Sequence, residues 1–222
     1  CEFLNQMGAS IKGIGSTKIT IEGVSALKPA NIEVIPDRIE AGTFLIAGAL
    51  LGEIKLEAVN VNHLDSVISK LKDCGCSLES STNSIRISRA DRLAPVDLTT
   101  DVFPGFATDL QAQWVALMTI ANGSSLITDT VYHDRFSHVP ELNRFGANIK
   151  VKDNTAFVRG VKELVGAPVM STDIRASASL IIAGLSAKGK TEISRVYHID
   201  RGYEKIEEKF RSLGAKIYRE NL

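Results

Sequence analysis

The sequence predicts an α/β (α+β) chain made of three βαβαββ units, set around a pseudo-threefold axis with one buried helix from each unit at the centre. The first observation behind this prediction is a recurring motif: an apolar residue, a glycine, a small residue, a spacer and another apolar residue. It occurs at Gly8, Gly75, Gly146 and Gly214, about 70 residues apart, and a repeat of this length is a supersecondary unit. The second observation is an Asp ahead of an apolar run in each complete unit.

The apolar runs that follow these aspartates are expected to be helices. A carboxylate at this position can accept hydrogen bonds from the free N–H groups of the first turn, and it meets the positive end of the helix dipole. The runs are rich in Ala, Gly, Ser and Leu on all sides, as buried helices are. The pairs of Asp and run are Asp37 with 38–51, Asp109 with 110–121, and Asp173 with 174–187.

The rest of each unit is predicted from turn residues and changes of hydrophobic period. A glycine ends each apolar run, a β-rich stretch follows, and an amphipathic helix then runs into the recurring glycine. Two strand-like segments close the unit. The β-rich stretches include 125–130 and 191–196, the amphipathic helices are 64–74, 139–145 and 202–213, and the closing segments include 77–79 with 84–88 and 148–152 with 155–159.

Two domains of very different size are predicted. Residues 1–30 are interpreted as the tail of a preceding, mostly missing domain together with a linker around Pro29, because they complete only the end of a repeat. Residues 31–222 are interpreted as the domain of three repeats. The chain opens inside a repeat helix and without an initiator Met, so we expect it to be a segment of a longer protein.

Composition narrows the classes of function. A content of 44% hydrophobic and 23% charged residues suits a globular chain with a soluble surface. Lys plus Arg and Asp plus Glu number 26 each, so no global field favours nucleic acid, and any anion site must be a local cluster of arginines. The apolar runs are too short to span a membrane, and we expect no membrane contact.

We expect neither a metal nor a cofactor. Three cysteines, Cys1, Cys74 and Cys76, fit a reducing cytoplasm, and a lone Cys-x-Cys pair is poor support for a metal site. The four histidines, His63, His133, His138 and His198, lack metal-ligand spacing and are interpreted as ordinary residues. Trp114 is expected in the core.

Five segments resemble motifs of the UDP-N-acetylglucosamine 1-carboxyvinyltransferase family, in unbroken order over the whole chain. They are Pro-Asp-Arg-Ile-Glu at 36–40, Phe-Ala-Thr-Asp-Leu-Gln-Ala-Gln at 106–113, Asp-Arg-Phe-Ser-His-Val-Pro-Glu-Leu at 134–142, Ser-Thr-Asp-Ile-Arg-Ala-Ser-Ala at 171–178 and His-Ile-Asp-Arg-Gly-Tyr-Glu at 198–204. The resemblance implies the inside-out α/β enolpyruvyl-transferase fold, with this chain as the C-terminal of two domains.

The resemblance also implies a reaction and its substrates. Family members move the enolpyruvyl group of phosphoenolpyruvate onto the 3-hydroxyl of UDP-N-acetylglucosamine and release phosphate, which is the first committed step of peptidoglycan synthesis. The two small-molecule substrates and the missing N-terminal domain of the same protein are therefore the expected partners. The family's Lys-Asn pair and its loop Cys would precede Cys1, and none of the three cysteines here matches that loop.

Asp109 matches the family position of the base that acts on the 3-hydroxyl. The alternative from spacing alone is that it only caps its helix, although Gln111 and Gln113 set this unit apart from the other two. By the same resemblance Asp173 handles the methylene group of phosphoenolpyruvate, and Arg175 helps to orient that substrate. A cation near a helix N-terminus is mildly unfavourable, which favours a functional reading of Arg175.

Arg201 matches a residue that binds phosphoenolpyruvate, and Arg135 matches one at the active-site rim near the sugar nucleotide. The alternative for both is a surface ion pair with the preceding residue, Asp134 or Asp200, which would contribute little.

Two more positions complete the predicted binding set. Arg38 fills the corresponding corner of the first unit and is expected to face the same cleft. Val131 matches the position whose backbone holds the acetamido group of the sugar, and its own side chain is expected to be a buried strand valine.

Two other functions stay open at this stage. The shikimate-pathway enolpyruvyl transferase, which acts on shikimate 3-phosphate, has related architecture, although the segments around Asp109, Arg135 and Arg175 favour the sugar-nucleotide enzyme. A non-catalytic domain that binds a nucleotide sugar is the alternative from another class. Because half of the expected site lies outside this chain, we expect the chain alone to fold and to be inactive.

Overall fold

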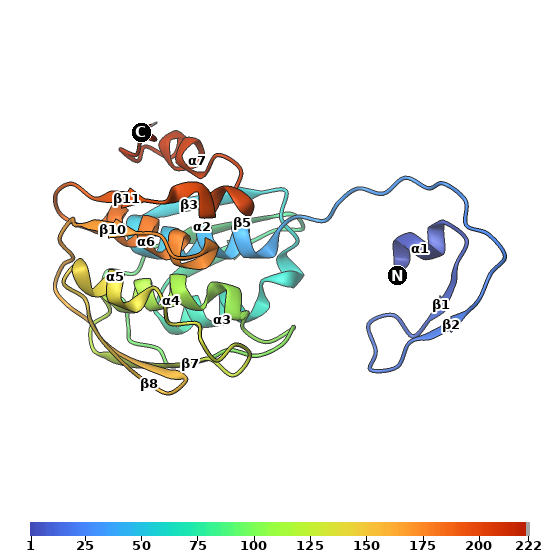
Figure 1. Cartoon of the computed structure of the whole chain (residues 1–222), viewed down its shortest axis with the longest axis horizontal. Coiled ribbons are helices and arrows are strands. Elements are labelled where there is room, and N and C mark those ends of the chain that lie inside the picture. Colours follow the sequence, from blue (N-terminus) through green and yellow to red (C-terminus); the bar gives the residue numbers. More distant parts are fainter. Residues whose placement is uncertain (221–222) are drawn as a thin grey trace. The chain divides into compact units, whose positions relative to one another are not determined.

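The computed structural model describes residues 1–220 and divides into two compact units, Cys1–Ile35 and Pro36–Leu222 (Figure 1). The division falls after residue 35, where the sequence predicted it after residue 30. In the first unit a short helix, α1 (Glu2–Gln6), precedes an antiparallel hairpin of β1 (Ser10–Lys12) and β2 (Thr20–Glu22). The second unit carries every residue of the candidate site.

Three helices form the centre of the second unit: α2 (Arg38–Leu51), α4 (Gln111–Met118) and α6 (Ile174–Ser186). They pack against one another in all three pairings, and every residue of α4 is buried. The prediction of buried central helices is therefore confirmed. Their small residues allow the close approach, because a Cβ at Gly42 would lie 2.5 Å from Cδ1 of Leu110, and one at Gly48 would lie 2.5 Å from Cγ2 of Ile87.

Three sheets cover these helices, one for each repeat. The first has the order β3-β5-β4 and the second β6-β7-β9-β8, while the third consists of β10 and β11 in parallel. The strands are β3 (Glu53–Glu57), β4 (Ser77–Ser80), β5 (Ser84–Ser88), β6 (Leu98–Thr99), β7 (Ser124–Thr128), β8 (Asn148–Lys152), β9 (Thr155–Arg159), β10 (Pro168–Met170) and β11 (Glu192–Ser194).

Outer helices and single turns complete the layers. The outer α-helices are α3 (Asp65–Asp73), α5 (Val139–Arg144) and α7 (Ile206–Ser212), and the 3₁₀ turns are η1 (Val61–His63), η2 (Thr108–Leu110) and η3 (Val196–Arg201). The strands keep period-two burial where a sheet meets the helices: Ile85 and Ile87 of β5 point inward, as do Ala156 and Val158 of β9. The apolar interior is thus enclosed between strands and central helices.

The prediction of three complete βαβαββ units is wrong in detail, since only the second unit has all four strands. Residues 31–37 form no strand ahead of α2, and the described residues after α7 form none either. The segment at Gly214 has the same sequence pattern as that at Gly146, yet it stays irregular. The reason is pairing: β8 forms against β9, whereas no strand follows the Gly214 segment in the described chain.

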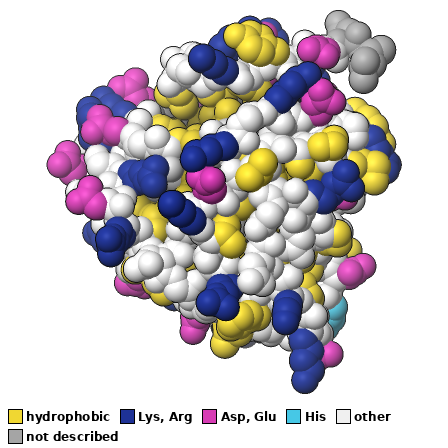
Figure 2. All heavy atoms as spheres, turned by 90° about the vertical axis from the view of Figure 1, so that its left-hand side faces the viewer, with side chains coloured by type: hydrophobic (Ala, Val, Ile, Leu, Met, Phe, Trp, Pro, Cys, Tyr) yellow, Lys and Arg dark blue, Asp and Glu magenta, His cyan; other side chains and the backbone are white. Residues whose placement is uncertain are grey.

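A groove lies where the third unit lacks these strands. Its volume is about 910 Å³, and its lining comes from α5, β10, α6, β11, η3, α7 and the tail 216–220. Figure 2 shows the side of the molecule on which β10 and β11 lie in Figure 1; there, hydrophobic side chains are visible between scattered charges of both signs. The groove does not include Asp109, Arg135 or Arg175.

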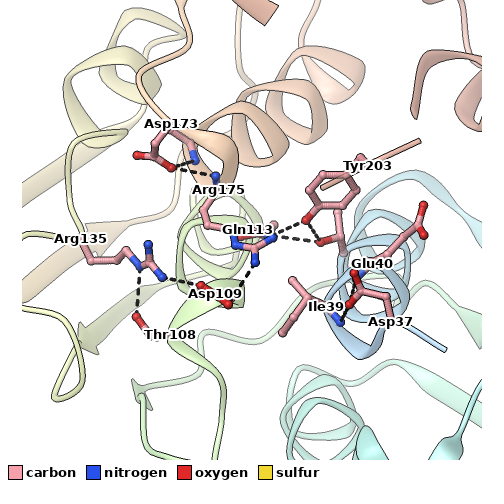
Figure 3. Close-up of polar contacts among 12 residues, drawn as sticks. Asp37, Ile39, Glu40, Thr108, Asp109, Gln113, Arg135, Asp173, Arg175 and Tyr203 are labelled. Atoms are coloured by element: carbon pink, nitrogen blue, oxygen red, sulfur yellow. Dashed lines mark hydrogen bonds and ion pairs between the residues drawn. The ribbon is translucent and has the colours of Figure 1, made fainter. Parts of the chain in front are cut away.

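A buried polar cluster joins two central helices to the segment after η3. The Thr43 hydroxyl of α2 lies 2.8 Å from the hydroxyl of Tyr203, and Nε2 of Gln113 on α4 donates to both, at 3.0 and 3.3 Å (Figure 3). All three side chains are almost fully buried, and the neighbouring Trp114 is in the core, as predicted. A buried hydroxyl with partners stabilises the fold, whereas partners left without it are costly.

We therefore predict that Tyr203→Phe lowers the free energy of unfolding by about 1 to 3 kcal/mol, because Thr43 and Gln113 lose a buried partner. Urea unfolding followed by circular dichroism measures this change. The matched control is Tyr218→Phe, whose ring is 75% exposed and which should change stability by less than about 0.5 kcal/mol. Equal effects of the two substitutions would show that the cluster does not stabilise the fold.

Candidate active site

Asp109 does not cap its helix, unlike its counterparts in the other two units. Asp37 accepts hydrogen bonds from the N–H groups of Ile39 and Glu40, and Asp173 accepts from those of Arg175 and Ala176. In the second unit the turn η2 intervenes, so that α4 begins two residues after Asp109 and its N-terminus has no side-chain cap. The interpretation of Asp109 as a helix cap is therefore wrong, and its carboxylate is free for other contacts.

Two arginines hold the carboxylate of Asp109, one on each oxygen (Figure 3). Nη2 of Arg135 donates to Oδ1, and Nη2 of Arg175 donates to Oδ2 at 3.0 Å. The arginine side chains are 18% and 17% exposed, while that of Asp109 is 37% exposed. The three groups thus form a charge-assisted cluster, partly screened by protein and open to solvent at the carboxylate.

Two further side chains support the guanidinium of Arg135, and the surroundings of Arg175 keep its guanidinium charged. Nε of Arg135 donates to Oγ1 of Thr108 at 3.1 Å, and its guanidinium carbon lies 5.0 Å from the centre of the Tyr132 ring. Burial works against the charge of Arg175, but its hydrogen bond to Asp109 and the influence of Tyr203 raise its pKa above the usual value. Arg175 therefore stays charged at the edge of the buried polar cluster.

Asp173 lies beside this cluster, at the N-terminus of α6. Its Oδ1 atom accepts from the two N–H groups of the helix, at 2.7 and 2.9 Å, and Oδ2 accepts from the hydroxyl of Ser137 at 2.9 Å. Burial alone would raise its pKa, but these hydrogen bonds and the charge of Arg135 lower it. The carboxylate is therefore ionised at neutral pH.

The surface ion pairs considered for Arg135 and Arg201 are wrong. Arg135 pairs with Asp109, and Asp200 binds Arg219 through two hydrogen bonds of 2.8 and 2.6 Å. Arg201 is exposed at the end of η3, and within residues 1–220 no ion pair holds it. Its side chain is available to a ligand.

Arg38 and Val131 form neither a hydrogen bond nor an ion pair with Asp109. Arg38, the first residue of α2, is half-buried with its guanidinium 5.3 Å from the centre of the Phe103 ring. Val131 lies beyond the end of β7 and is 43% exposed, so the expectation of a buried strand valine is wrong. Its N–H donates to Oδ1 of Asp129 at 3.0 Å, and its carbonyl accepts no hydrogen bond from the described residues.

Sequence reasoning missed several side chains that support the site. Thr108 and Tyr203 stand inside the resembling segments, but neither carries a charge that would single it out. Asp129 closes β7 and Ser137 follows it in the next loop, and only their positions in space link them to Arg135 and Asp173. The presence of Gln113 in the second unit alone, with no counterpart in the other two, was the one signal in the sequence for the buried polar cluster.

The described residues contain no cluster of side chains suited to binding a metal ion. Among residues 1–220 no group of three His, Cys, Asp or Glu side chains could hold a metal ion. Cys74 and Cys76 are free and buried, and burial raises the pKa of Cys74 to about 12, which makes that thiol a poor nucleophile. The helices of the described part are all too short or too polar to cross a membrane.

Comparison with known proteins defines the class. The crystal structure of the enolpyruvyl transferase NikO from Streptomyces tendae superimposes with a TM-score of 0.86 at 27% identity, over 96% of this chain and 52% of that one. An EPSP synthase from Acinetobacter baumannii has the same fold, with a TM-score of 0.72 at 21% identity over 95% of this chain and 53% of that chain. The predicted enolpyruvyl-transferase fold is confirmed.

The family model described as EPSP synthase (3-phosphoshikimate 1-carboxyvinyltransferase) matches residues 1–210, and the chain belongs to this family. Curated relatives named UDP-N-acetylglucosamine 1-carboxyvinyltransferase, from Chloroherpeton thalassium and Prosthecochloris aestuarii, are 56% and 54% identical over 99% and 100% of the chain. The chain spans about half of their length, 52% of each. The resemblance found in the sequence is thus confirmed.

His138 gives the site region a measurable pH dependence. The residue is 1% exposed, and burial lowers its pKa to about 4 from an ordinary value of 6.5, although the charge of Asp173 opposes this shift. The folded state therefore keeps His138 neutral, while the unfolded chain takes up a proton below pH 6.5. Stability is full above that pH and is lost as the pH falls from 6.5 towards 4.

We predict that this one group lowers the free energy of unfolding by about 2 kcal/mol between pH 7 and pH 5. His138→Gln removes the titrating ring, so the variant should lose about 2 kcal/mol less than the wild type over this interval. Urea unfolding at both pH values measures the difference. An identical loss in both proteins would show that His138 is not held neutral by the fold.

Proposed function

We propose that this chain supplies one wall of the active site of an enolpyruvyl transferase that joins phosphoenolpyruvate to the 3-hydroxyl of UDP-N-acetylglucosamine. Phosphate is released, in the cytoplasm, as the first committed step of peptidoglycan synthesis. The observation that carries the proposal is the carboxylate of Asp109 between two arginines, in a chain whose curated relatives of 51% to 56% identity bear this enzyme's name. The other wall would come from the half of the protein that these relatives have beyond this chain.

Asp109 acts as the base in this proposal. A sugar hydroxyl is a weak nucleophile, so a carboxylate takes its proton as the 3-oxygen bonds to C2 of phosphoenolpyruvate, and C3 gains a proton to become a methyl group. In the second step C3 loses a proton, the C2–O bond to phosphate breaks and the methylene group is restored. The exposed side of the Asp109 carboxylate is where the hydroxyl would approach.

The arginines supply the countercharge. Phosphoenolpyruvate carries a phosphate and a carboxylate, and planar guanidinium groups bind both with paired hydrogen bonds. We assign Arg175 to this substrate, together with Arg201, which no ion pair within residues 1–220 holds, and Arg135 to the side of the sugar nucleotide. An anionic ligand would compete with the Asp109 carboxylate for these guanidinium groups.

In this proposal Asp173, Val131 and Arg38 bind or orient the two substrates. Oδ1 of Asp173 is used by the helix N-terminus, so Oδ2, beside Ser137, is the oxygen that would meet the methylene group of phosphoenolpyruvate. The N–H of Val131 is used by Asp129, so its carbonyl would accept from the acetamido N–H of the sugar. Arg38, against Phe103, is assigned to the rim of the same cleft.

One alternative acceptor has support of its own. The family description and the Acinetobacter baumannii structures name EPSP synthase, which would make shikimate 3-phosphate the acceptor. These structures are only 20% to 21% identical to this chain, whereas relatives named for the sugar nucleotide reach 56%. A non-catalytic nucleotide-sugar-binding domain is the other alternative, and release of phosphate would separate it from both.

We predict that the intact protein releases phosphate from phosphoenolpyruvate with UDP-N-acetylglucosamine as acceptor, and does not do so with shikimate 3-phosphate. A coupled phosphate assay with each acceptor measures this directly. Residues 1–222 alone should release none, because an open face leaves charge contacts screened by solvent. Turnover with shikimate 3-phosphate only would contradict the assignment, and binding of the sugar nucleotide without turnover would favour the non-catalytic alternative.

Asp109→Asn should lower kcat of the intact protein by about 10² to 10⁴-fold, which is the usual contribution of a general base, and should leave the affinity for UDP-N-acetylglucosamine largely intact. Asp37→Asn is the matched control, since it changes the corresponding position of the first unit and Asn is an equally good cap. Steady-state kinetics of both variants decide the matter. An Asp109→Asn variant as active as the control would remove this residue from the chemistry.

A further inference from the structure

We infer that Asp129 is a positioning residue for Arg135. Its buried carboxylate fixes Thr108 and Tyr132. These two side chains hold the guanidinium of Arg135, which in turn pairs with Asp109. The catalytic consequence of this arrangement rests on the proposed function, whereas the arrangement itself concerns contacts within this chain alone.

Asp129 directly follows β7 and has no exposed surface. Its Oδ2 atom accepts from the Thr108 hydroxyl at 2.7 Å, and Oδ1 accepts from the N–H groups of Val131 and Tyr132 at 3.0 and 2.8 Å. Its N–H donates to the carbonyl of Asn154 at 2.9 Å, and its carbonyl accepts from Nδ2 of Asn154 at 3.0 Å. A buried carboxylate is tolerated only where hydrogen bonds replace water, and these bonds leave Asp129 one orientation.

The charge of Asp129 sets the direction of the next hydrogen bond. An ionised carboxylate can only accept, so the single hydroxyl proton of Thr108 must point to Asp129. The lone pairs of Oγ1 are then free to accept from Nε of Arg135, at 3.1 Å. The guanidinium is thereby oriented with Nη2 towards Asp109.

The same carboxylate also shapes the surface on which Arg135 rests. By binding the N–H groups of two successive residues it closes the turn after β7, which places the Tyr132 ring 5.0 Å from the guanidinium carbon of Arg135. A cation over an aromatic face is stabilised by the ring electrons. Both supports of Arg135 therefore depend on one side chain that forms no hydrogen bond or ion pair with Arg135 or Asp109.

Replacing Asp129 by Asn tests this chain of contacts with almost no change of shape. Oδ1 must still serve the two N–H groups, so Nδ2 of the new amide would face Thr108. An amide N–H donates, and it would compete with Arg135 for the oxygen of Thr108. Thr108→Val removes that oxygen, Thr108→Ser keeps it, and Asp153→Asn, at the exposed turn between β8 and β9, is the matched control.

The variants are compared in the intact protein, alone and combined with Arg135→Ala. Asp129→Asn and Thr108→Val should lower kcat/KM for phosphoenolpyruvate and UDP-N-acetylglucosamine roughly 10- to 100-fold, because a displaced group loses its catalytic geometry. Each loss should shrink below about threefold in the Arg135→Ala background, because both residues act through Arg135. Thr108→Ser and Asp153→Asn should stay close to the wild type.

A second measurement does not depend on activity. In protein labelled with ¹⁵N-arginine, the Nε–H signal of Arg135 should exchange with solvent faster in Asp129→Asn and Thr108→Val than in the wild type. Unchanged exchange in both variants, or losses of activity that persist undiminished in the Arg135→Ala background, would overturn the inference. If Asp129→Asn does not fold, Thr108→Val decides, and an inactive wild type would contradict the proposed function while the exchange still tests the positioning.

Discussion

The structure depends on the need to bury three helices that have no polar face. Because α2, α4 and α6 carry apolar or small residues on nearly every side, they can be stable only against one another and beneath sheets. Their N-terminal turns then come together, as the contacts of Thr43, Gln113 and Arg175 show. Charged residues that are far apart in sequence meet at this end, where Asp109 pairs with Arg135 and Arg175.

The meeting of the three helix N-termini bears on the one aspartate at which the second unit differs from the other two. Asp37 and Asp173 complete their helix N-termini, and their carboxylates are used for that purpose. The 3₁₀ turn at Asp109 lifts its carboxylate away from α4 and presents it to arginines that lie 26 and 66 residues downstream. The position that caps a helix in the first and third units is thus part of a polar cluster in the second, where Arg135 and Arg175 bind the carboxylate.

Local signals in the sequence predicted the central helices, two of the three caps and the outer helices with small errors at their ends. They could not predict the turn at Asp109, because a carboxylate two residues before a helix reads like a cap until the backbone is known. The local sequence also could not predict that the Gly214 segment stays irregular. A strand needs a partner strand, and the residues of one segment do not show whether a partner is present. The role of Asp129 could not be predicted for the same reason, because it depends on contacts with Thr108 and Tyr132 that only the folded chain brings together.

The central claim is that arginines from separate segments hold Asp109, and a double-mutant cycle on unfolding free energy tests it most directly. Asp109→Asn, Arg175→Gln and the double variant are unfolded in urea. Because the pair is charge-assisted and Arg175 is mostly buried, the account predicts a coupling energy of roughly 1 to 2 kcal/mol. A coupling energy below about 0.3 kcal/mol, at the lower end of the range for solvent-exposed ion pairs, would contradict it.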